Sequence, residues 1–264
     1  MQLWDLHRGD SPLIINVPHA GIALPDALRQ RLTPQALAVP DTDWHVERLY
    51  AFAREAGITL LCATQSRYMV DLNRDPTGAA LYAGADNTEL CPTRTFANEA
   101  VYVEGTTPSP GEVAARVDAY FVPYHALLAD EIDRIRARHG HAVVLDGHSI
   151  RGEVPRFFSG HLPALNLGTA DGTSCARELQ DRAAAVLAAA QGFSHVVNGR
   201  FKGGYITRHY GQRKQGVHAL QLEVAQDCYM DEAPPYRFDA VRAAALIAVL
   251  RQLTESLQDW RPPR

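Results

Sequence analysis

Short apolar runs alternate along the chain with longer stretches in which apolar residues recur every three or four positions. The short runs, rich in β-branched residues, predict strands over residues 13–17, 58–64, 67–72, 142–146, 195–198 and 218–224. Helical spacing predicts helices over residues 43–57, 112–139, 174–192 and 238–258. This alternation predicts one α/β domain over residues 1–264, a three-layer sandwich around a largely parallel mixed sheet.

Two features interrupt this regular pattern. Pro123 lies inside the longest helical stretch, where it should remove a backbone hydrogen bond and kink the helix. The region from Asp75 to Pro110 is rich in Thr, Pro, Gly and Asn, so we expect it to be irregular. A loop of that length in a compact domain is more often functional than idle.

Composition excludes several classes of function. The 264 residues carry a formal net charge of -4, which argues against general nucleic-acid binding. The first residues do not resemble a signal peptide, and no apolar run reaches the ~20 residues that span a bilayer. The four cysteines form no Cys-x-x-Cys pair, which is typical of a reduced cytoplasmic protein. The oligomeric state cannot be read from the sequence.

Two histidines follow predicted strands in the same way. His19 ends the stretch PLIINVPHAG, and His148 follows the strand AVVLD in VVLDGHSI. Because the carboxyl ends of parallel strands form the ligand-binding edge of an α/β sheet, both imidazoles should meet there. A single histidine is often structural, but two presented alike favour a metal site. Catalytic zinc usually takes three protein ligands and a water molecule.

The stretch PDTDWHVE offers the third ligand. Asp41 suits the N-cap of the following helix, and Asp43 suits its first turn, so each has a structural explanation. We prefer Asp43 as the ligand and Asp41 as a cap or supporting group. His45 is a third possibility, although it should point further along the helix.

A glutamate stands within the apolar stretch ALQLEVAQ. Leu220, Leu222 and Val224 fall on one face of the predicted strand, which leaves Gln221 and Glu223 on the other. A glutamate in such a strand is costly unless it is paired or used. It could pair with an arginine, or act as general base and acid beside a metal.

Basic residues gather at two further places. In RYMVDLNRDP, Asn73 and Arg74 follow an apolar run, and an arginine is a natural bidentate clamp for a substrate carboxylate. The glycine-rich stretch NGRFKGGYITRHYG, residues 198–211, is either an ordinary surface loop or a mobile loop that closes over an anionic substrate. Its titratable side chains are Arg200, Lys202, Arg208 and His209.

Taken together, the motifs VPHAG, DTDWH, SRYMVDLNR, DGHSI, NGRFKGGYITRHYG and HALQLEVAQ resemble the N-formylglutamate amidohydrolase family. The resemblance runs from about residue 13 to residue 230 in unchanged order. It implies a fold like that of the zinc carboxypeptidases and hydrolysis of N-formyl-L-glutamate to formate and L-glutamate, the last step of histidine degradation. Aspartoacylases are wider relatives, and their Asp-Leu-Asn-Arg stretch, which grips a substrate carboxylate, is identical to residues 71–74 here.

The resemblance also implies roles for particular residues. His19, Asp43 and His148 would hold one divalent ion, zinc or alternatively cobalt, and Glu223 would act as general base and acid. The wider relatives carry His-x-x-Glu as their first metal motif, whereas Ile22 stands three residues after His19 here.

Further side chains would bind the substrate. Arg208 or His209 would stabilise the oxyanion, and Arg74 with Asn73 would hold one substrate carboxylate. Candidates for the second carboxylate are Arg67, Lys202 and Arg208. A deacylase of another N-acyl amino acid, or a non-catalytic protein that binds a metal or an amino acid, is the alternative.

Overall fold

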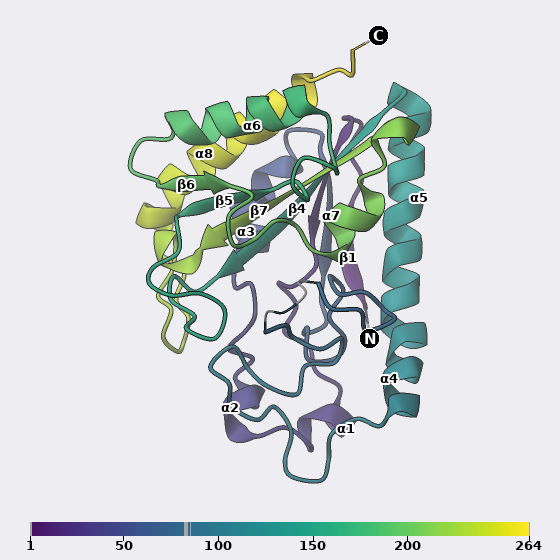
Figure 1. Ribbon diagram of the computed structural model, residues 1–264, viewed down its shortest axis with the longest axis vertical. Helices are drawn as coiled ribbons and strands as arrows, with labels where there is room; N and C mark the ends of the chain where they lie inside the picture. The colour runs from purple at the N-terminus through teal and green to yellow at the C-terminus, as the bar shows by residue number, and fades with distance from the viewer. Residues whose placement is uncertain (1, 82–83, 85, 264) are drawn as a thin grey trace.

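The computed structural model describes residues 2–81, 84 and 86–263, and these form one sheet covered by helices on both faces (Figure 1). The strands are β1 (Trp4–His7), β2 (Leu13–Val17), β3 (Thr59–Ala63), β4 (Ala142–Ile150), β5 (Leu165–Gly168), β6 (His195–Val197) and β7 (Val217–Ala225). Their order is β1-β3-β2-β4-β7-β5-β6. Strands β3, β2, β4 and β7 run parallel, while β1 and β5 pair antiparallel to their inner neighbours. The predicted α/β class with a largely parallel mixed sheet is confirmed.

The helices divide into two layers and a lower lobe. Helices α3 (Val46–Leu49), α6 (Arg177–Ala189) and α8 (Ala240–Asp259) cover one face of the sheet. Helices α5 (Val122–His139) and α7 (Tyr205–Tyr210) cover the other. The short helices α1 (Asp26–Arg29) and α2 (Pro34–Leu37) lie apart from the sheet, at the bottom of Figure 1. The remaining helical segments are η1 (Ala51–Ala53), α4 (Pro110–Arg116), η2 (Val117–Phe121), η3 (Arg213–Gln215) and η4 (Gln226–Cys228).

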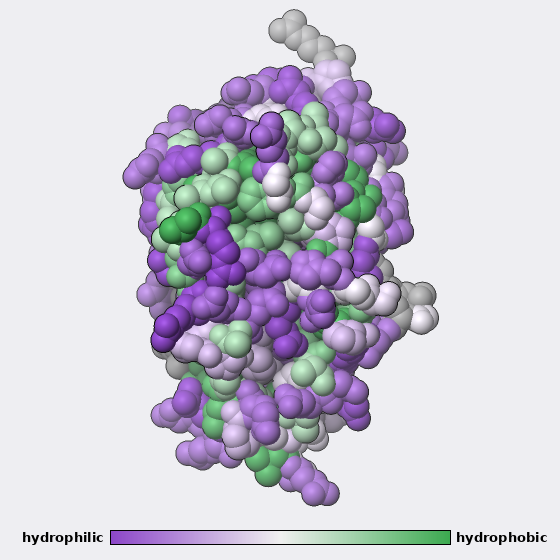
Figure 2. Space-filling model, turned by 90° about the vertical axis from the view of Figure 1, so that its left-hand side faces the viewer, coloured by the Kyte–Doolittle hydropathy of each residue, from purple (hydrophilic) through white to green (hydrophobic). Residues whose placement is uncertain are grey.

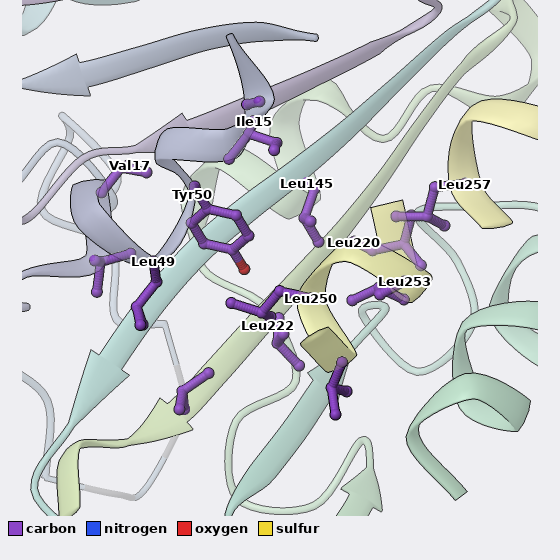
Figure 3. Close-up of a cluster of buried hydrophobic side chains, with 14 of the residues drawn as sticks. Ile15, Val17, Leu49, Tyr50, Leu145, Leu220, Leu222, Leu250, Leu253 and Leu257 are labelled. Atoms are coloured by element: carbon purple, nitrogen blue, oxygen red, sulfur yellow. The ribbon is translucent and has the colours of Figure 1, made fainter. Parts of the chain in front are cut away.

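Side chains along the central strands point alternately to the two faces of the sheet, and this alternation separates two apolar cores. Leu145 on β4 and Leu220 and Leu222 on β7 point into the larger core, where they meet Tyr50 and Leu250 (Figure 3). The opposite face carries a smaller apolar core against α5, and this core does not reach the carboxyl ends of the strands. Full burial of a leucine side chain contributes about 1.5–3 kcal/mol, so the larger core is the main source of stability.

The longest helical prediction is confirmed, with a change of helix type. Ser109 caps α4 by accepting a hydrogen bond from the backbone of Glu112, and α4 leads into the π-helical segment η2 and then α5. Pro123 lies in the first turn of α5, directly after η2. A proline cannot donate its backbone hydrogen bond, and the wider π turn before it accommodates that interruption. The predicted helices over 174–192 and 238–258 are confirmed as α6 and α8.

Two predicted elements are wrong. Residues 67–72 form turns instead of a strand, because the Met69 N–H bonds to the Ser66 carbonyl and the chain leaves the sheet after β3. The helix expected over residues 43–57 is reduced to α3 and η1. His45, with φ of 64°, adopts a left-handed conformation, so α3 cannot begin before Val46.

Other elements escaped prediction. Strands β1 and β5 are four residues long, and α1, α2 and α7 are four to six residues long, too short for a periodic signal. Most of the stretch 75–110 is irregular as expected, although residues 82, 83 and 85 lie outside the described residues. None of the helices described is long and apolar enough to cross a membrane. Figure 2 shows a largely hydrophilic surface on the side of α6 and α8, around a smaller apolar area.

Candidate active site

Polar side chains form two rows across one face of the sheet, near the carboxyl ends of its strands. In the lower row, Asn16 on β2 is in register with Asp146 on β4, which is in register with Gln221 on β7. One step further along, His148 is in register with Glu223. The sequence predicted this placement for Glu223 and Gln221, which lie opposite the leucines of β7.

His19, Asp43 and His148 converge at the end of the upper row. Their potential ligand atoms all lie within 4.8 Å of one another, and all three side chains are buried. The His148 Nδ1 lies 2.9 Å from the Asp43 Oδ2, and the His19 Nδ1 lies 3.7 Å from the same oxygen. Two imidazole nitrogens and a carboxylate oxygen are a donor set that suits a divalent metal such as zinc.

Each imidazole is held from behind by a carboxylate. The His19 Nε2 lies 2.7 Å from the Asp71 Oδ1, and the His148 Nε2 lies 2.9 Å from the Asp146 Oδ2. A neutral histidine that donates through Nε2 leaves the lone pair of Nδ1 toward Asp43. Such outer carboxylates orient metal-binding histidines and raise their basicity. The carboxylates behind the histidines, as well as the candidate ligands themselves, therefore fit a metal ion.

The loop before α3 brings Asp43 to the histidines. The Asp43 N–H donates to the His19 carbonyl at 3.1 Å, and the Ser149 N–H donates to the Asp43 Oδ2 at 3.1 Å. Asp43 thus precedes the helix and does not lie in its first turn, because Val46 is the first residue of α3.

Asp41 and His45 have different partners. Both Asp41 oxygens accept from the Phe96 backbone N–H, and the Tyr68 hydroxyl donates to Oδ2 at 2.8 Å, so Asp41 is not the cap of α3. The His45 Nε2 lies 2.7 Å from the Tyr236 carbonyl, away from the histidine pair. The structure brings Asp43, and neither of the other two candidates, to His19 and His148.

The charges in this cluster depend on one another. Burial alone would raise the pKa of Asp43, but hydrogen bonds from His148 and His19 outweigh it and lower that pKa. Burial would lower the pKa of His148, and Asp146 and Asp43 raise it well above its ordinary value. The same balance holds the pKa of Asp71 well below its usual range, because His19 and Arg67 offset its burial. A cluster with this concentration of negative charge is prepared for a cation.

Glu223 stands beside His148 on the neighbouring strand. Burial raises the pKa of Glu223 to about 8. Its Oε2 accepts a hydrogen bond from the Gln221 Nε2 at 3.3 Å. A carboxyl group with a pKa near neutrality can both take and return a proton, which is what a general base and acid requires.

A pocket opens onto this cluster, and three arginines line it. The Arg67 NH2 donates to the Asp71 Oδ2 at 2.6 Å, and the Arg67 NH1 lies 3.6 Å from the Asp43 Oδ1. The Arg67 Nε is buried and has no hydrogen-bond partner among the described residues. Arg74 donates through Nε to the Thr88 hydroxyl at 2.9 Å. Arg200 donates through Nε to the Phe157 carbonyl at 2.8 Å. The pocket therefore combines the carboxylate-rich cluster with a cationic wall.

Three predicted site residues lie elsewhere. Arg208 and His209 are exposed on the outer side of α7, because Ile206 and Tyr210 turn the other side into the core. They border a separate surface pocket with Asp75. Lys202 pairs with Asp171 at 3.1 Å and is not part of the lining around His19 and His148.

Asn73 lines the pocket, and its amide group also links β4 to α7. Its Nδ2 donates to the Asp146 Oδ2 at 2.8 Å, and its Oδ1 accepts from the Ile206 N–H at 2.7 Å. Its backbone carbonyl accepts from the Tyr205 N–H at 3.2 Å. Asn73 thus ties the first turn of α7 to the carboxylate behind His148.

Sequence reasoning did not assign Asp71 or Asp146 to the site, and it named Arg200 only as one of the titratable side chains of a loop that could close over an anionic substrate. The signal for Asp71 and Asp146 was present, since each is a carboxylate within or beside an apolar run and must find a buried partner. Asp146 also precedes His148 by two residues, which places both on one face of a strand. Nothing in the local pattern separates Arg200 from the other basic residues of its loop.

Comparisons with known proteins agree on one family. Residues 11–230 match the family model described as N-formylglutamate amidohydrolase. An N-formylglutamate deformylase of Pseudomonas aeruginosa is 49% identical over 253 residues, which cover 96% of this chain and 95% of the relative. The deformylase of Pseudomonas putida is 45% identical over 258 residues, 98% of this chain and 96% of the relative.

Solved structures show the same fold. The crystal structure of N-formylglutamate amidohydrolase from Ralstonia eutropha JMP134 superposes with a TM-score of 0.81 at 25% identity, covering 97% of each chain. A gene product of Agrobacterium tumefaciens, at 18% identity and a TM-score of 0.73, shares the fold over 97% of this chain and 95% of its own.

Proposed function

The chain belongs to the N-formylglutamate amidohydrolase family, as its sequence predicts, and we propose that it hydrolyses N-formyl-L-glutamate to formate and L-glutamate in histidine degradation. The observation that carries this proposal is the position of Glu223, in register with His148 and open to the same pocket as His19 and Asp43. That arrangement gives a general base beside a candidate metal centre, which amide hydrolysis needs.

His19 and His148 through Nδ1, with a carboxylate oxygen of Asp43, are the proposed metal ligands. Zinc is the ion we favour, with cobalt as the alternative, because two imidazoles and one carboxylate are a common catalytic zinc set. When bound there, the ion would polarise the formyl carbonyl and acidify a water molecule. Asp71 and Asp146 keep the two rings in the ligating orientation.

Glu223 is the proposed proton carrier. Its carboxylate takes a proton from the attacking water and returns it to the glutamate nitrogen as the C–N bond breaks. Burial raises the pKa of Glu223 to about 8, so neither the protonated nor the ionised form is far out of reach at neutral pH. Gln221 holds this carboxylate by a hydrogen bond and so limits its movement.

Arg67 is the cation we assign to the charge that develops on the formyl oxygen. It is buried, borders the pocket and lies 3.6 Å from Asp43, whereas Arg208 and His209 lie on the outer side of α7. Its ion pair with Asp71 fixes the guanidinium before substrate arrives. A fixed cation of this kind costs no reorganisation during the reaction.

Arg74 and Arg200 are the proposed clamps for the two substrate carboxylates. Both line the pocket. Each donates a hydrogen bond from its Nε to another part of the protein, and this bond fixes the orientation of the guanidinium group. Asn73, whose amide is bonded at both ends, supports the site instead of contacting substrate.

A substrate panel tests this proposal. The purified protein, loaded with zinc, is given N-formyl-L-glutamate, N-formyl-L-aspartate and N-acetyl-L-aspartate, and product release is followed for each. We expect the highest kcat/KM for N-formyl-L-glutamate. A preference for another N-acyl amino acid would replace the substrate and keep the chemistry, whereas metal binding without hydrolysis of any of them would favour a binding protein.

A further inference from the structure

A line of buried hydrogen bonds leads from α5 to His148. The Tyr124 hydroxyl donates to the Asn16 Oδ1 at 2.7 Å, and the Asn16 Nδ2 donates to the Asp146 Oδ1 at 2.8 Å. The Asp146 Oδ2 lies 2.9 Å from the His148 Nε2. All four side chains are buried, and Tyr124 and Asn16 lie behind the pocket lining.

Neither Asn16 nor Tyr124 is explained by packing. Asn16 interrupts the apolar strand β2, and a buried amide is costly unless its oxygen and its nitrogen are both bonded. Tyr124 belongs to the apolar core between α5 and the sheet, where a phenylalanine would fill nearly the same space. The polar atoms are therefore retained for the hydrogen bonds that they make.

The direction of each bond in this line is fixed by chemistry. A carboxylate accepts hydrogen bonds, so Asn16 must turn its NH2 group toward Asp146. Its oxygen then faces Tyr124, which has one proton to donate and gives it to that oxygen. Without the tyrosine hydroxyl the Asn16 oxygen loses its donor, and the amide is then held only from the Asp146 side.

We infer that Tyr124 and Asn16 are positioning residues that set the metal affinity of His148 by fixing Asp146. Asp146 accepts Asn16 on one oxygen and Asn73 with His148 on the other, so its rotation is defined from both sides. A rotated Asp146 loses its alignment with the His148 Nε2, and the Nδ1 lone pair then loses its direction toward Asp43. This inference rests on the metal centre of the proposed function.

The chain contains a matched control for Tyr124. Tyr50 is equally buried, but it packs on the opposite face of the sheet (Figure 3). Its hydroxyl has no hydrogen-bond partner among the residues that the structure describes. Tyr124→Phe and Tyr50→Phe therefore each remove a buried hydroxyl group, and only Tyr124→Phe removes a hydrogen bond from the line that leads to His148.

The experiment measures zinc affinity without substrate, by competition with a chelator of known affinity. Changes behind a ligand typically cost 10–100-fold in metal affinity, and we expect Tyr124→Phe to weaken zinc binding about 10-fold. Tyr50→Phe should bind zinc like the wild type. The visible spectrum of the cobalt-loaded protein should change in Tyr124→Phe and not in Tyr50→Phe, which a loss of general stability would not produce.

A double-mutant cycle tests whether Tyr124 acts through Asn16. Asn16→Ala should weaken zinc binding at least as much as Tyr124→Phe, and adding Tyr124→Phe to it should change little. Wild-type affinity in Tyr124→Phe, an equal loss in Tyr50→Phe, or fully additive effects would overturn the inference. If Asn16→Ala does not fold, the tyrosine pair decides alone. A wild type that binds no zinc would instead refute the metal centre itself.

Discussion

The two faces of strands β4 and β7 are built from alternate residues of the same sequence and have opposite characters. Leu145, Leu220 and Leu222 enter the larger apolar core, where α8 covers them (Figure 3). Asp146 and Glu223, each next to one of these leucines, face the polar rows. The difference indicates that one rigid ladder serves both stability and the proposed site, because the apolar face fixes the strands whose other face carries the proposed catalytic and metal-binding groups.

The polar face buries charged and polar groups, which is unfavourable unless they have partners. Buried carboxylates and imidazoles are tolerated there because almost every atom has a partner, as with Asp146 and its three donors. Glu223 is held more weakly, since the hydrogen bond that its side chain accepts from Gln221 is long at 3.3 Å. A weakly satisfied carboxyl group at the mouth of a satisfied network is a mark of function.

The largest expected effect is a loss of activity from a substitution on the polar face. Glu223→Gln keeps the size of the side chain and removes its ability to carry a proton. We expect kcat to fall by about 10²–10⁴-fold, the usual contribution of a general base, while zinc affinity and melting temperature stay close to wild type. Glu178→Gln, on the exposed side of α6, is the matched control and should keep full activity. Retained turnover in Glu223→Gln would remove Glu223 from the mechanism.

The second effect appears on the apolar face, one residue away. Leu222→Ala empties space in a fully buried core, so the free energy of unfolding should fall by about 2–5 kcal/mol. Chemical denaturation measures this loss, and kcat per folded molecule should stay near wild type. A large loss of kcat with little loss of stability would contradict the division between the faces.

A smaller effect concerns substrate affinity. Arg200→Ala should raise KM for N-formyl-L-glutamate about 10–100-fold and change kcat less, because a hydrogen bond to a charged group contributes about 1.5–3 kcal/mol. Lys202→Ala removes a cation from the same loop, where it pairs with Asp171 outside the pocket, and should leave KM unchanged. Equal effects of the two variants would show that only the net charge of the loop matters.

The smallest effect is a dependence of stability on pH that the active site does not cause. Burial lowers the pKa of His125, which lies on α5 and packs against Tyr205 and Tyr210 of α7, to about 4, while an unfolded histidine titrates near 6.5. The unfolded chain therefore binds more protons between these values, and stability present above pH 6.5 is lost as the pH falls toward 4.

His125→Gln should reduce this slope by up to about 1.4 kcal/mol per pH unit, the value for one proton. Urea unfolding at a series of pH values measures it. His195→Gln, at an exposed position on β6, is the control and should leave the slope unchanged. An unaltered slope in His125→Gln would mean that other groups cause the acid sensitivity.

The sequence predicted the features that follow from the alternation of side chains along a strand and from the position of a residue at a strand end. Apolar runs marked β2, β4 and β7, and the position of His19 and His148 just after two of these runs brought both rings to one edge, although β4 itself extends to Ile150 and includes His148. Alternation also placed Glu223 opposite the leucines of β7. These predictions needed only the period of a strand and the direction of a parallel sheet.

The remainder depends on contacts between distant segments. Residues 67–72 have a strand-like composition, yet Arg67 and Asp71 are held by Asp43 and His19, so the chain turns there. The outward direction of Arg208 follows from the packing of Ile206, which only the folded α7 reveals. Short strands and helices are likewise set by their neighbours and carry too few residues for a pattern.

Removal and return of the metal tests the central claim most directly. Protein stripped with a chelator is titrated with zinc, and bound metal and formate release from N-formyl-L-glutamate are measured on the same samples. We predict that activity is lost on stripping, returns in proportion to bound zinc and is complete at one ion per chain. Full activity in protein shown to contain no metal would contradict the claim that His19, Asp43 and His148 form a metal centre for hydrolysis.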